Sequence, residues 1–228
     1  MNSFFRTTLV ASACLVLTVS AATGRAFAVT SGVGTATLDK VTTVATVGKP
    51  APDFEVMLAD GKKTTLDQMT KEHSLVVLEW YNQDCPYVRK HYDSGNMQAL
   101  QKTYTGQKVA WLTIVSSAQG KQGYLTLEEA QKRKASGEKD FASTALLLDP
   151  KGTIGKSYGA KTTPHMYIVD KQRVLRYAGA IDGVPTAKKE DVNTDKKYFD
   201  IAASKLLAGK TLTTEEAINK PYGCSVKY

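Results

Sequence analysis

The sequence predicts an α/β fold in which helices cover a central sheet. Three short apolar runs rich in β-branched residues, at 75–80, 109–115 and 166–170, are typical of buried strands. Helix signals follow the first run, from Cys85 onward, and the second run, from Thr126 onward. Strands that alternate with helices form βαβ units, and the strands of such units lie parallel in one sheet.

Turn residues and helix caps predict the remaining elements. The helix after Cys85 is expected to run to about Tyr104, and the capping box that begins at Thr126 opens a helix that ends near Ala135. The other expected elements are strands at 54–57, 64–66 and 145–148, a short helix at 154–158, a strand at 174–178 that forms a hairpin with 166–170, and a helix at 198–207.

Composition divides the chain into four parts. Residues 1–28 have the pattern of a secretory signal, with Arg6 near the start, an apolar run at 9–22 and small residues around Phe27. We therefore expect cleavage after Ala28, a periplasmic or secreted protein, and no stable membrane span after cleavage. The expected parts are a signal peptide at 1–28, a linker at 29–46, a folded domain at 47–209 and a C-terminal tail at 210–228.

Charge argues against a nucleic-acid partner. The 228 residues carry a formal net charge of +8 at pH 7, which is mild for a chain of this length. The lysines are scattered in short groups, without the interleaved aromatic residues that stack on bases. We therefore interpret the lysines as solvated surface and expect no binding of nucleic acid.

Cys85 stands where a cysteine becomes reactive. It follows the polar segment Asn82-Gln83-Asp84 and precedes Pro86, a residue that suits the first turn of a helix. Backbone N–H groups and the positive end of the helix dipole stabilise a thiolate at such a position, and the thiolate is the reactive form. Arg89, one turn further along, adds positive charge. The competing interpretation is a buried and inert cysteine.

The order of these elements is similar to that of the thioredoxin superfamily over residues 47–207. The opening Val47-Gly48-Lys49-Pro50-Ala51-Pro52-Asp53-Phe54 resembles the start of its redoxin and peroxiredoxin branch, the alkyl hydroperoxide reductase/thiol-specific antioxidant proteins. Thr163-Pro164 resembles the cis-proline that faces the reactive cysteine in that superfamily and leaves backbone groups free to pair with a substrate chain. The resemblance implies a thioredoxin-like three-layer α/β/α sandwich with a central mixed sheet.

The resemblance also points to an acid near the cysteine. Glu79 stands where thioredoxins carry a buried acid, which implies a proton acceptor with a raised pKa. Two departures set the chain apart from its relatives. Val88 replaces the second cysteine of the thioredoxin Cys-x-x-Cys pair, and Asn82 replaces the threonine that peroxiredoxins place three residues before the cysteine. The closest resemblance is therefore to a peroxiredoxin-like group with a single active-site cysteine.

This resemblance implies an exported thiol-dependent oxidoreductase in which the Cys85 thiolate attacks a disulfide or a peroxide. Cys224 is the candidate resolving cysteine, because Cys14 leaves with the signal peptide, and a static disulfide between Cys85 and Cys224 is an equal alternative. Expected partners are a protein disulfide or peroxide substrate and a dithiol reductant, with no cofactor. Asn82 is expected to donate a hydrogen bond to a peroxide oxygen. The candidate catalytic residues are Cys85, Cys224, Glu79, Pro164, Asn82 and Arg89.

Two other functions are compatible with the same residues. A Cu(I)-binding module would use Cys85 together with His91 and His165, since thiolate and imidazole suit copper. A redox-inert scaffold would keep the fold, but its Cys85 thiol would react no faster than free cysteine.

Overall fold

The computed structural model of the chain describes residues 44–57, 62–136, 141–192 and 194–228. The expected signal peptide at 1–28 and most of the expected linker at 29–46 lie outside these residues, so they stay predictions. No helix within the described ranges combines the length and the apolar character that a membrane crossing requires.

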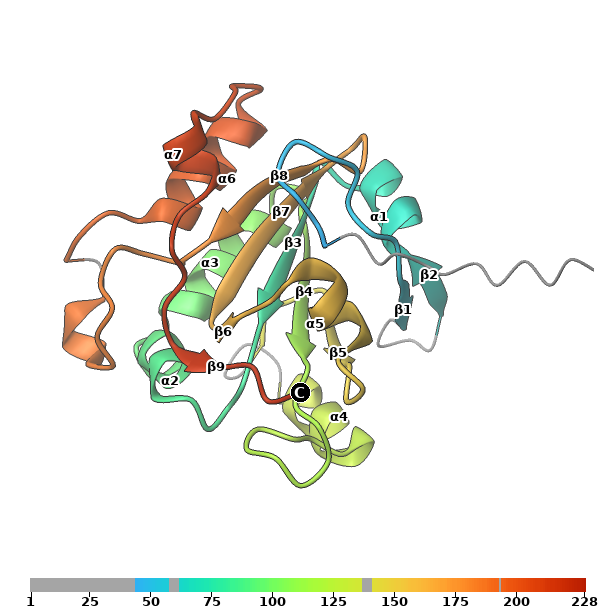
Figure 1. Ribbon diagram of the computed structural model, residues 1–228, viewed down its shortest axis with the longest axis vertical. Coiled ribbons are helices and arrows are strands. Elements are labelled where there is room, and N and C mark those ends of the chain that lie inside the picture. Colours follow the sequence, from blue (N-terminus) through green and yellow to red (C-terminus); the bar gives the residue numbers. More distant parts are fainter. Residues whose placement is uncertain (1–43, 58–61, 137–140, 193) are drawn as a thin grey trace, which may run out of the picture. The chain divides into compact units, whose positions relative to one another are not determined.

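A five-stranded mixed sheet forms the centre of the fold (Figure 1). The strands lie in the order β5 (Ala145–Leu148), β4 (Ala110–Val115), β3 (Leu75–Trp80), β7 (His165–Asp170) and β8 (Leu175–Gly179). Strand β4 is parallel to both β3 and β5, whereas β7 is antiparallel to both β3 and β8. The predicted βαβ units and the predicted hairpin are thus joined in one thioredoxin-like sheet.

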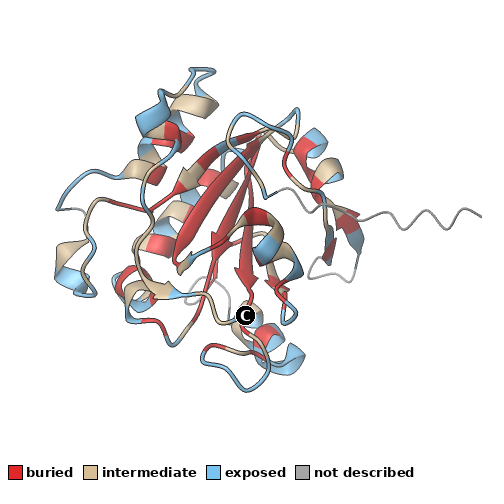
Figure 2. Cartoon of the chain, viewed as in Figure 1, coloured by how far each residue is buried: buried red, intermediate tan, exposed pale blue. Residues whose placement is uncertain are grey.

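Helices cover both faces of this sheet. Every residue of β3 is buried (Figure 2), and its side chains alternate between two hydrophobic clusters. Helices α1 (Leu66–Glu72) and α5 (Thr153–Tyr158) supply side chains to one cluster, whereas α3 (Asn96–Thr105) and α6 (Tyr198–Leu207) supply side chains to the other. Each large apolar side chain buried in this way contributes about 1.5–3 kcal/mol. The result is the three-layer sandwich that the resemblance implies.

The helix expected from Cys85 to Tyr104 is in fact two helices. Helix α2 (Pro86–Asp93) ends before Gly95, and α3 begins at Asn96. Gly95 has a φ of 74°, a left-handed conformation that glycine adopts without steric cost and that stops a helix. The prediction of one continuous helix was wrong because a helical pattern tolerates a single internal glycine, so the pattern alone did not reveal the break.

The strand expected at 64–66 lies one residue earlier than predicted. Strand β2 (Lys63–Thr65) pairs antiparallel with β1 (Glu55–Met57), but the chain turns into α1 at Leu66. Thr65 caps this helix: its hydroxyl accepts a hydrogen bond from the Gln68 N–H, and the Gln68 side chain accepts one from the Thr65 N–H. The Thr-x-x-Gln spacing is a capping box that the sequence analysis missed.

The expected C-terminal tail at 210–228 packs with the rest of the described fold. The described residues from 44 onward form one compact unit, and the tail carries helix α7 (Thr214–Ala217) and strand β9 (Cys224–Ser225). Strand β9 pairs antiparallel with β6 (Thr162–Thr163), the short strand directly before Pro164. The remaining elements are the predicted helix α4 (Leu127–Ala135) and a 3-10 turn at Lys189–Asp191.

The capping box of α1 gives a prediction about stability. Thr65→Ala removes the hydroxyl that accepts the hydrogen bond of the Gln68 N–H, so we expect the free energy of unfolding to fall by about 1 kcal/mol. Thr65→Ser keeps the hydroxyl and is the matched control, for which we expect most of this loss to disappear. Urea denaturation measures both, and an equal loss in the two variants would contradict the role of the cap.

Candidate active site

Cys85 is the N-cap residue of α2, as the sequence predicts. Its N–H donates to the Asn82 carbonyl at 3.1 Å, and its own carbonyl accepts from the Val88 and Arg89 N–H groups at 3.0 and 2.9 Å. Pro86 occupies the first turn of the helix, where its missing N–H costs nothing. This geometry brings the Cys85 side chain to the positive end of the helix dipole, where a negatively charged sulfur is stabilised.

The loop that contains Pro164 lies directly against this sulfur. The Cys85 thiol donates a hydrogen bond to the Thr163 carbonyl at 3.0 Å, and the Thr163–Pro164 peptide bond is cis. Cys85 has no exposed surface and belongs to an apolar cluster with Tyr81, Val88 and neighbouring side chains. The structure therefore brings Cys85 and Pro164 together, and it also closes the sulfur off from solvent.

Cys224 is the second thiol at the site. The β9–β6 pairing sets Cys224 opposite Thr163, and its side chain packs against the apolar cluster that contains Cys85. Both cysteines are free thiols. Burial, a hydrogen bond to Cys85 and the charge of an ionised Cys85, in that order of size, together raise the pKa of Cys224 to about 12. Cys224 is therefore a protonated thiol at neutral pH, within hydrogen-bond reach of the Cys85 sulfur.

Gly223 allows the close approach of these two segments. It has a φ of 130°, and a Cβ atom on it would lie 2.1 Å from the Thr163 carbonyl oxygen and 2.8 Å from the Thr163 carbonyl carbon. No side chain fits against backbone at such distances. Glycine at 223 is thus the residue that lets the tail reach the loop before Pro164.

Tyr222 fixes the tail directly before Gly223. Its hydroxyl donates to Asp182 and lies 3.3 Å from His91 Nε2, and its ring lies 5.6 Å below the Lys90 amine. The side chain of Lys90 is fully buried, and its amine donates to the Val184 carbonyl at 2.8 Å and lies 3.5 Å from the Asp182 carboxylate. These residues form a buried polar cluster beneath the tail, which we call the Tyr222 cluster.

Glu79 is completely buried, and hydrogen bonds link it to α2, α3 and β4. The donors are the Tyr92 hydroxyl at 2.7 Å, Gln101 Nε2 at 3.0 Å, Trp111 Nε1 at 2.7 Å and the Thr113 hydroxyl at 3.2 Å. Burial raises the pKa of this carboxyl, and the four hydrogen bonds oppose that shift. Cys85 is not among these donors. The arrangement ties helices to the sheet, and the expected proton transfer from Cys85 to Glu79 stays a prediction.

Asn82 shapes the loop before the helix. Its Oδ1 atom accepts from the Asp84 N–H at 2.9 Å, and its amide packs so closely on Gly123 that a Cβ there would lie 2.3 Å away. Asn82 is almost fully buried. Its side chain is engaged in these contacts, and the expected hydrogen bond to a peroxide oxygen stays a prediction.

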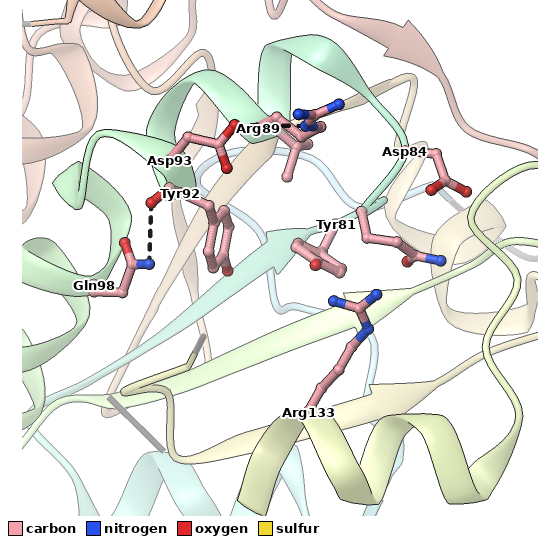
Figure 3. Close-up of a pocket in the computed structure, with 9 residues that line it drawn as sticks. Tyr81, Asp84, Arg89, Tyr92, Asp93, Gln98 and Arg133 are labelled. Carbon is pink, nitrogen blue, oxygen red and sulfur yellow. Dashed lines mark hydrogen bonds and ion pairs between the residues drawn. The ribbon is translucent and has the colours of Figure 1, made fainter. Parts of the chain in front are cut away.

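Arg89 faces a neighbouring pocket of about 530 Å³. Its guanidinium is largely exposed and lies 3.5 Å from the Asp93 carboxylate. Figure 3 shows Arg89 and Arg133 on opposite sides of Tyr81, one of the aromatic residues that line this pocket. The backbone of Arg89 thus belongs to the site, whereas its side chain contacts Asp93.

The histidines of the copper alternative are each engaged elsewhere. His91 Nδ1 lies 3.0 Å from the Asn96 amide, and His165 Nδ1 lies 3.1 Å from the Tyr167 hydroxyl. Within the described ranges no three side chains of His, Cys, Asp or Glu are grouped as metal ligands would be. Cys85, His91 and His165 therefore do not converge as the copper hypothesis requires.

Sequence reasoning did not find the Tyr222 cluster. The Pro221-Tyr222-Gly223-Cys224 run carries the only local signal, since an aromatic residue and a glycine flank the cysteine. Lys90 directly follows Arg89 in the sequence, and its amine is bound within the cluster. Nothing in the sequence pairs Lys90 with Asp182, which lies 92 positions further along.

Comparisons with known proteins agree with this geometry. The model of the AhpC/TSA family matches residues 47–178. No curated protein matches the chain. A hypothetical protein from Sinorhizobium meliloti 1021 is similar in structure, with a TM-score of 0.64, 24% identity, and coverage of 82% of this chain and 96% of that one.

Two further solved structures share the fold. An uncharacterized conserved protein from Geobacillus kaustophilus has a TM-score of 0.61 and 24% identity, over 80% of this chain and 92% of that one. A candidate thiol:disulfide interchange protein, DsbE, from Chlorobium tepidum has a TM-score of 0.51 and 21% identity, over 72% and 99% of the two chains. At these identities the likeness establishes the thioredoxin-like fold.

The environment of Glu79 predicts a large effect of a small substitution. In Glu79→Gln, the new carboxamide N–H₂ faces donors such as Gln101 or Trp111, so at least one buried donor loses its acceptor. We expect the free energy of unfolding to fall by roughly 1–3 kcal/mol. Glu72→Gln makes the same chemical change on the exposed face of α1, and we expect less than about 0.5 kcal/mol there. Denaturant titrations measure both losses, and an equal loss in the two variants would contradict the stabilising role of the four hydrogen bonds.

Buried histidines predict a loss of stability in acid. Burial lowers the pKa of His91 to about 4 and that of His165 to about 3, from 6.5. The unfolded chain therefore binds more protons than the native chain below pH 6.5, and the free energy of unfolding falls as the pH is lowered from 6.5 towards 4. We expect a loss on the order of 2 kcal/mol per histidine at pH 5. Urea titrations at pH 7.5 and 5 test this, and His165→Asn should reduce the pH dependence.

Proposed function

Since the chain belongs to the AhpC/TSA family, we propose that it is a two-cysteine thiol oxidoreductase in which Cys85 is the nucleophile and Cys224 the resolving cysteine. Thioredoxin-like structures with a redox role support the general class. The proposal goes further in naming the two sulfurs and their order of action.

One observation carries this proposal: Cys224 lies beside Cys85 as a free thiol, on a strand that pairs with Thr163. The two thiols differ in environment. Cys85 is the N-cap residue of α2, beside the backbone N–H groups of the first helical turn, whereas burial and the neighbouring sulfur raise the pKa of Cys224. This difference supports attack by Cys85 first and a second step by Cys224.

The reaction with a hydroperoxide balances with these two residues. The Cys85 thiolate attacks one peroxide oxygen, the O–O bond breaks, and Cys85 becomes a sulfenic acid while the departing hydroxide or alkoxide takes up a proton. The Cys224 sulfur then attacks the Cys85 sulfur, an S–S bond forms, and the sulfenic oxygen leaves as water with the Cys224 proton. A dithiol reductant returns both cysteines to thiols by two thiol–disulfide exchanges.

The same nucleophile is suited to a disulfide substrate, where attack forms a mixed disulfide and expels the other sulfur as a thiolate. Export, expected from residues 1–28, would place the protein in a compartment that permits either reaction.

Mass spectrometry with hydrogen peroxide tests the roles of the two cysteines. We expect the wild type to lose two hydrogens and form a Cys85–Cys224 disulfide. In Cys224→Ser the Cys85 sulfenic acid should accumulate and react with dimedone, because the resolving thiol is absent. In Cys85→Ser we expect at least a hundredfold slower oxidation of the remaining site thiol. Oxidation of Cys224 in Cys85→Ser at the wild-type rate would overturn the assignment, as would a wild type that reacts no faster than free cysteine.

A further inference from the structure

Residues 219–228, which we call the strap, run across the face of the molecule that carries Cys85 (Figure 1). Side chains anchor the strap before, beside and beyond β9. Asn219 accepts a hydrogen bond from the Ala180 N–H at 2.7 Å and donates one to the Tyr177 hydroxyl at 3.1 Å. Tyr222 is held by the Tyr222 cluster described above.

The other end of the strap is held by Tyr228. Its hydroxyl donates to the Ala160 carbonyl at 2.9 Å, and its ring lies where a Cβ on Gly152 or Gly155 would be, within 2.3 to 2.6 Å. The Lys156 amine lies 5.5 Å above this ring. The strap is therefore fastened on both sides of Cys224, by contacts that do not involve either sulfur.

Between these anchors the strap occupies the backbone edge beside the nucleophile. Strand β9 pairs with Thr162 and Thr163, and the Val226 N–H donates to the Lys161 carbonyl at 3.1 Å. An extended polypeptide docks on a protein by adding a strand to an open edge, which requires free N–H and C=O groups there. At 161–163 the strap already uses these groups, so a polypeptide must displace it to reach Cys85.

Small molecules face a different barrier. Cys85 has no exposed surface in this closed arrangement, and a molecule of two heavy atoms needs a smaller opening to reach the sulfur than a polypeptide does. A polypeptide disulfide needs the loss of the β9–β6 pairing and of the contacts of Gly223 with Thr163. The strap therefore distinguishes substrates by their size, and it occupies the backbone edge at 161–163 on which a polypeptide would dock.

We propose that the strap is the specificity element of the Cys85 site: it admits hydrogen peroxide and similarly small hydroperoxides and excludes polypeptide disulfides. This inference rests on the proposed nucleophilic role of Cys85. It narrows the substrate class of that role from disulfides and peroxides in general to small hydroperoxides.

The test compares two probes in the full chain with Cys224→Ser, so that the strap is present but cannot resolve. The small probe is hydrogen peroxide, and the large probe is a ten-residue peptide that carries one cysteine as a 2-pyridyl disulfide. Attack of Cys85 on that disulfide forms a Cys85–peptide bond and releases pyridine-2-thione, and peptide mass spectrometry locates both products on Cys85.

Gly223→Ala, added to this background, forces a Cβ into the Thr163 backbone and should lift the strap. We expect the rate with the peptide to rise at least tenfold and the rate with hydrogen peroxide to change less than threefold. Gly209→Ala is the matched control: its φ is 70°, and a Cβ there meets no atom within 4 Å. That variant should leave both rates within about twofold of the Cys224→Ser background.

A chain that ends at Pro221 is the second variant, in case Gly223→Ala does not fold. It lacks the strap from Tyr222 onward, and the same tenfold gain with the peptide is expected. The proposal is overturned if the folded strap variants react with the peptide no faster than the Cys224→Ser background does. If Cys85 reacts with neither probe faster than free cysteine in any variant, the proposed function itself fails, and the two failures are thereby distinguished.

Discussion

The pairing of β9 with β6 is the constraint on which the site depends. It joins two segments that lie some 60 positions apart in the sequence, the loop before Pro164 and the C-terminal tail, and it places Cys224 beside the Cys85 sulfur. Backbone hydrogen bonds set the register, so residue 224, and neither neighbour, lies opposite Thr163. Gly223 makes the approach close enough, because any larger residue would overlap the Thr163 backbone.

Two buried polar groups, the Glu79 carboxyl and the Lys90 amine, hold α2 and the tail in place around Cys85. The Glu79 carboxyl connects β3 to α2 through Tyr92, which keeps the helix that begins at Cys85 fixed on the sheet. On the other side of that helix, the Lys90 amine binds Asp182 and the Val184 carbonyl and supports the ring of Tyr222. Buried polar groups are tolerated when they are hydrogen-bonded: Glu79 accepts four hydrogen bonds, and Lys90 is both hydrogen-bonded and paired with Asp182. Helix α2 therefore holds its sulfur and the tail in one rigid unit.

Much of the fold was predictable because its signals are local. Periodicity and turn residues identified the strands at 75–80 and 166–170 and the helix at 198–207, and the thioredoxin-like order of elements followed from them. The errors were also local in origin: Gly95 divides a helical pattern without interrupting its period, and the capping box at Thr65 stands directly after a strand. The Cys85 helix start was predictable in the same way, from a polar loop followed by proline.

The amino-acid sequence by itself determined the position of Cys85 at a helix N-terminus, the proline of the facing loop and the presence of a second cysteine at 224. These follow from short-range chemistry: φ restrictions, caps and residue type. Only the tertiary structure decided that Cys224 lies at Cys85, that Lys90 is buried with Asp182, and that the tail closes the sulfur off from solvent. Each of these contacts joins segments distant in the chain, and the packing of the whole sheet and its helices brings them together, which no local pattern encodes.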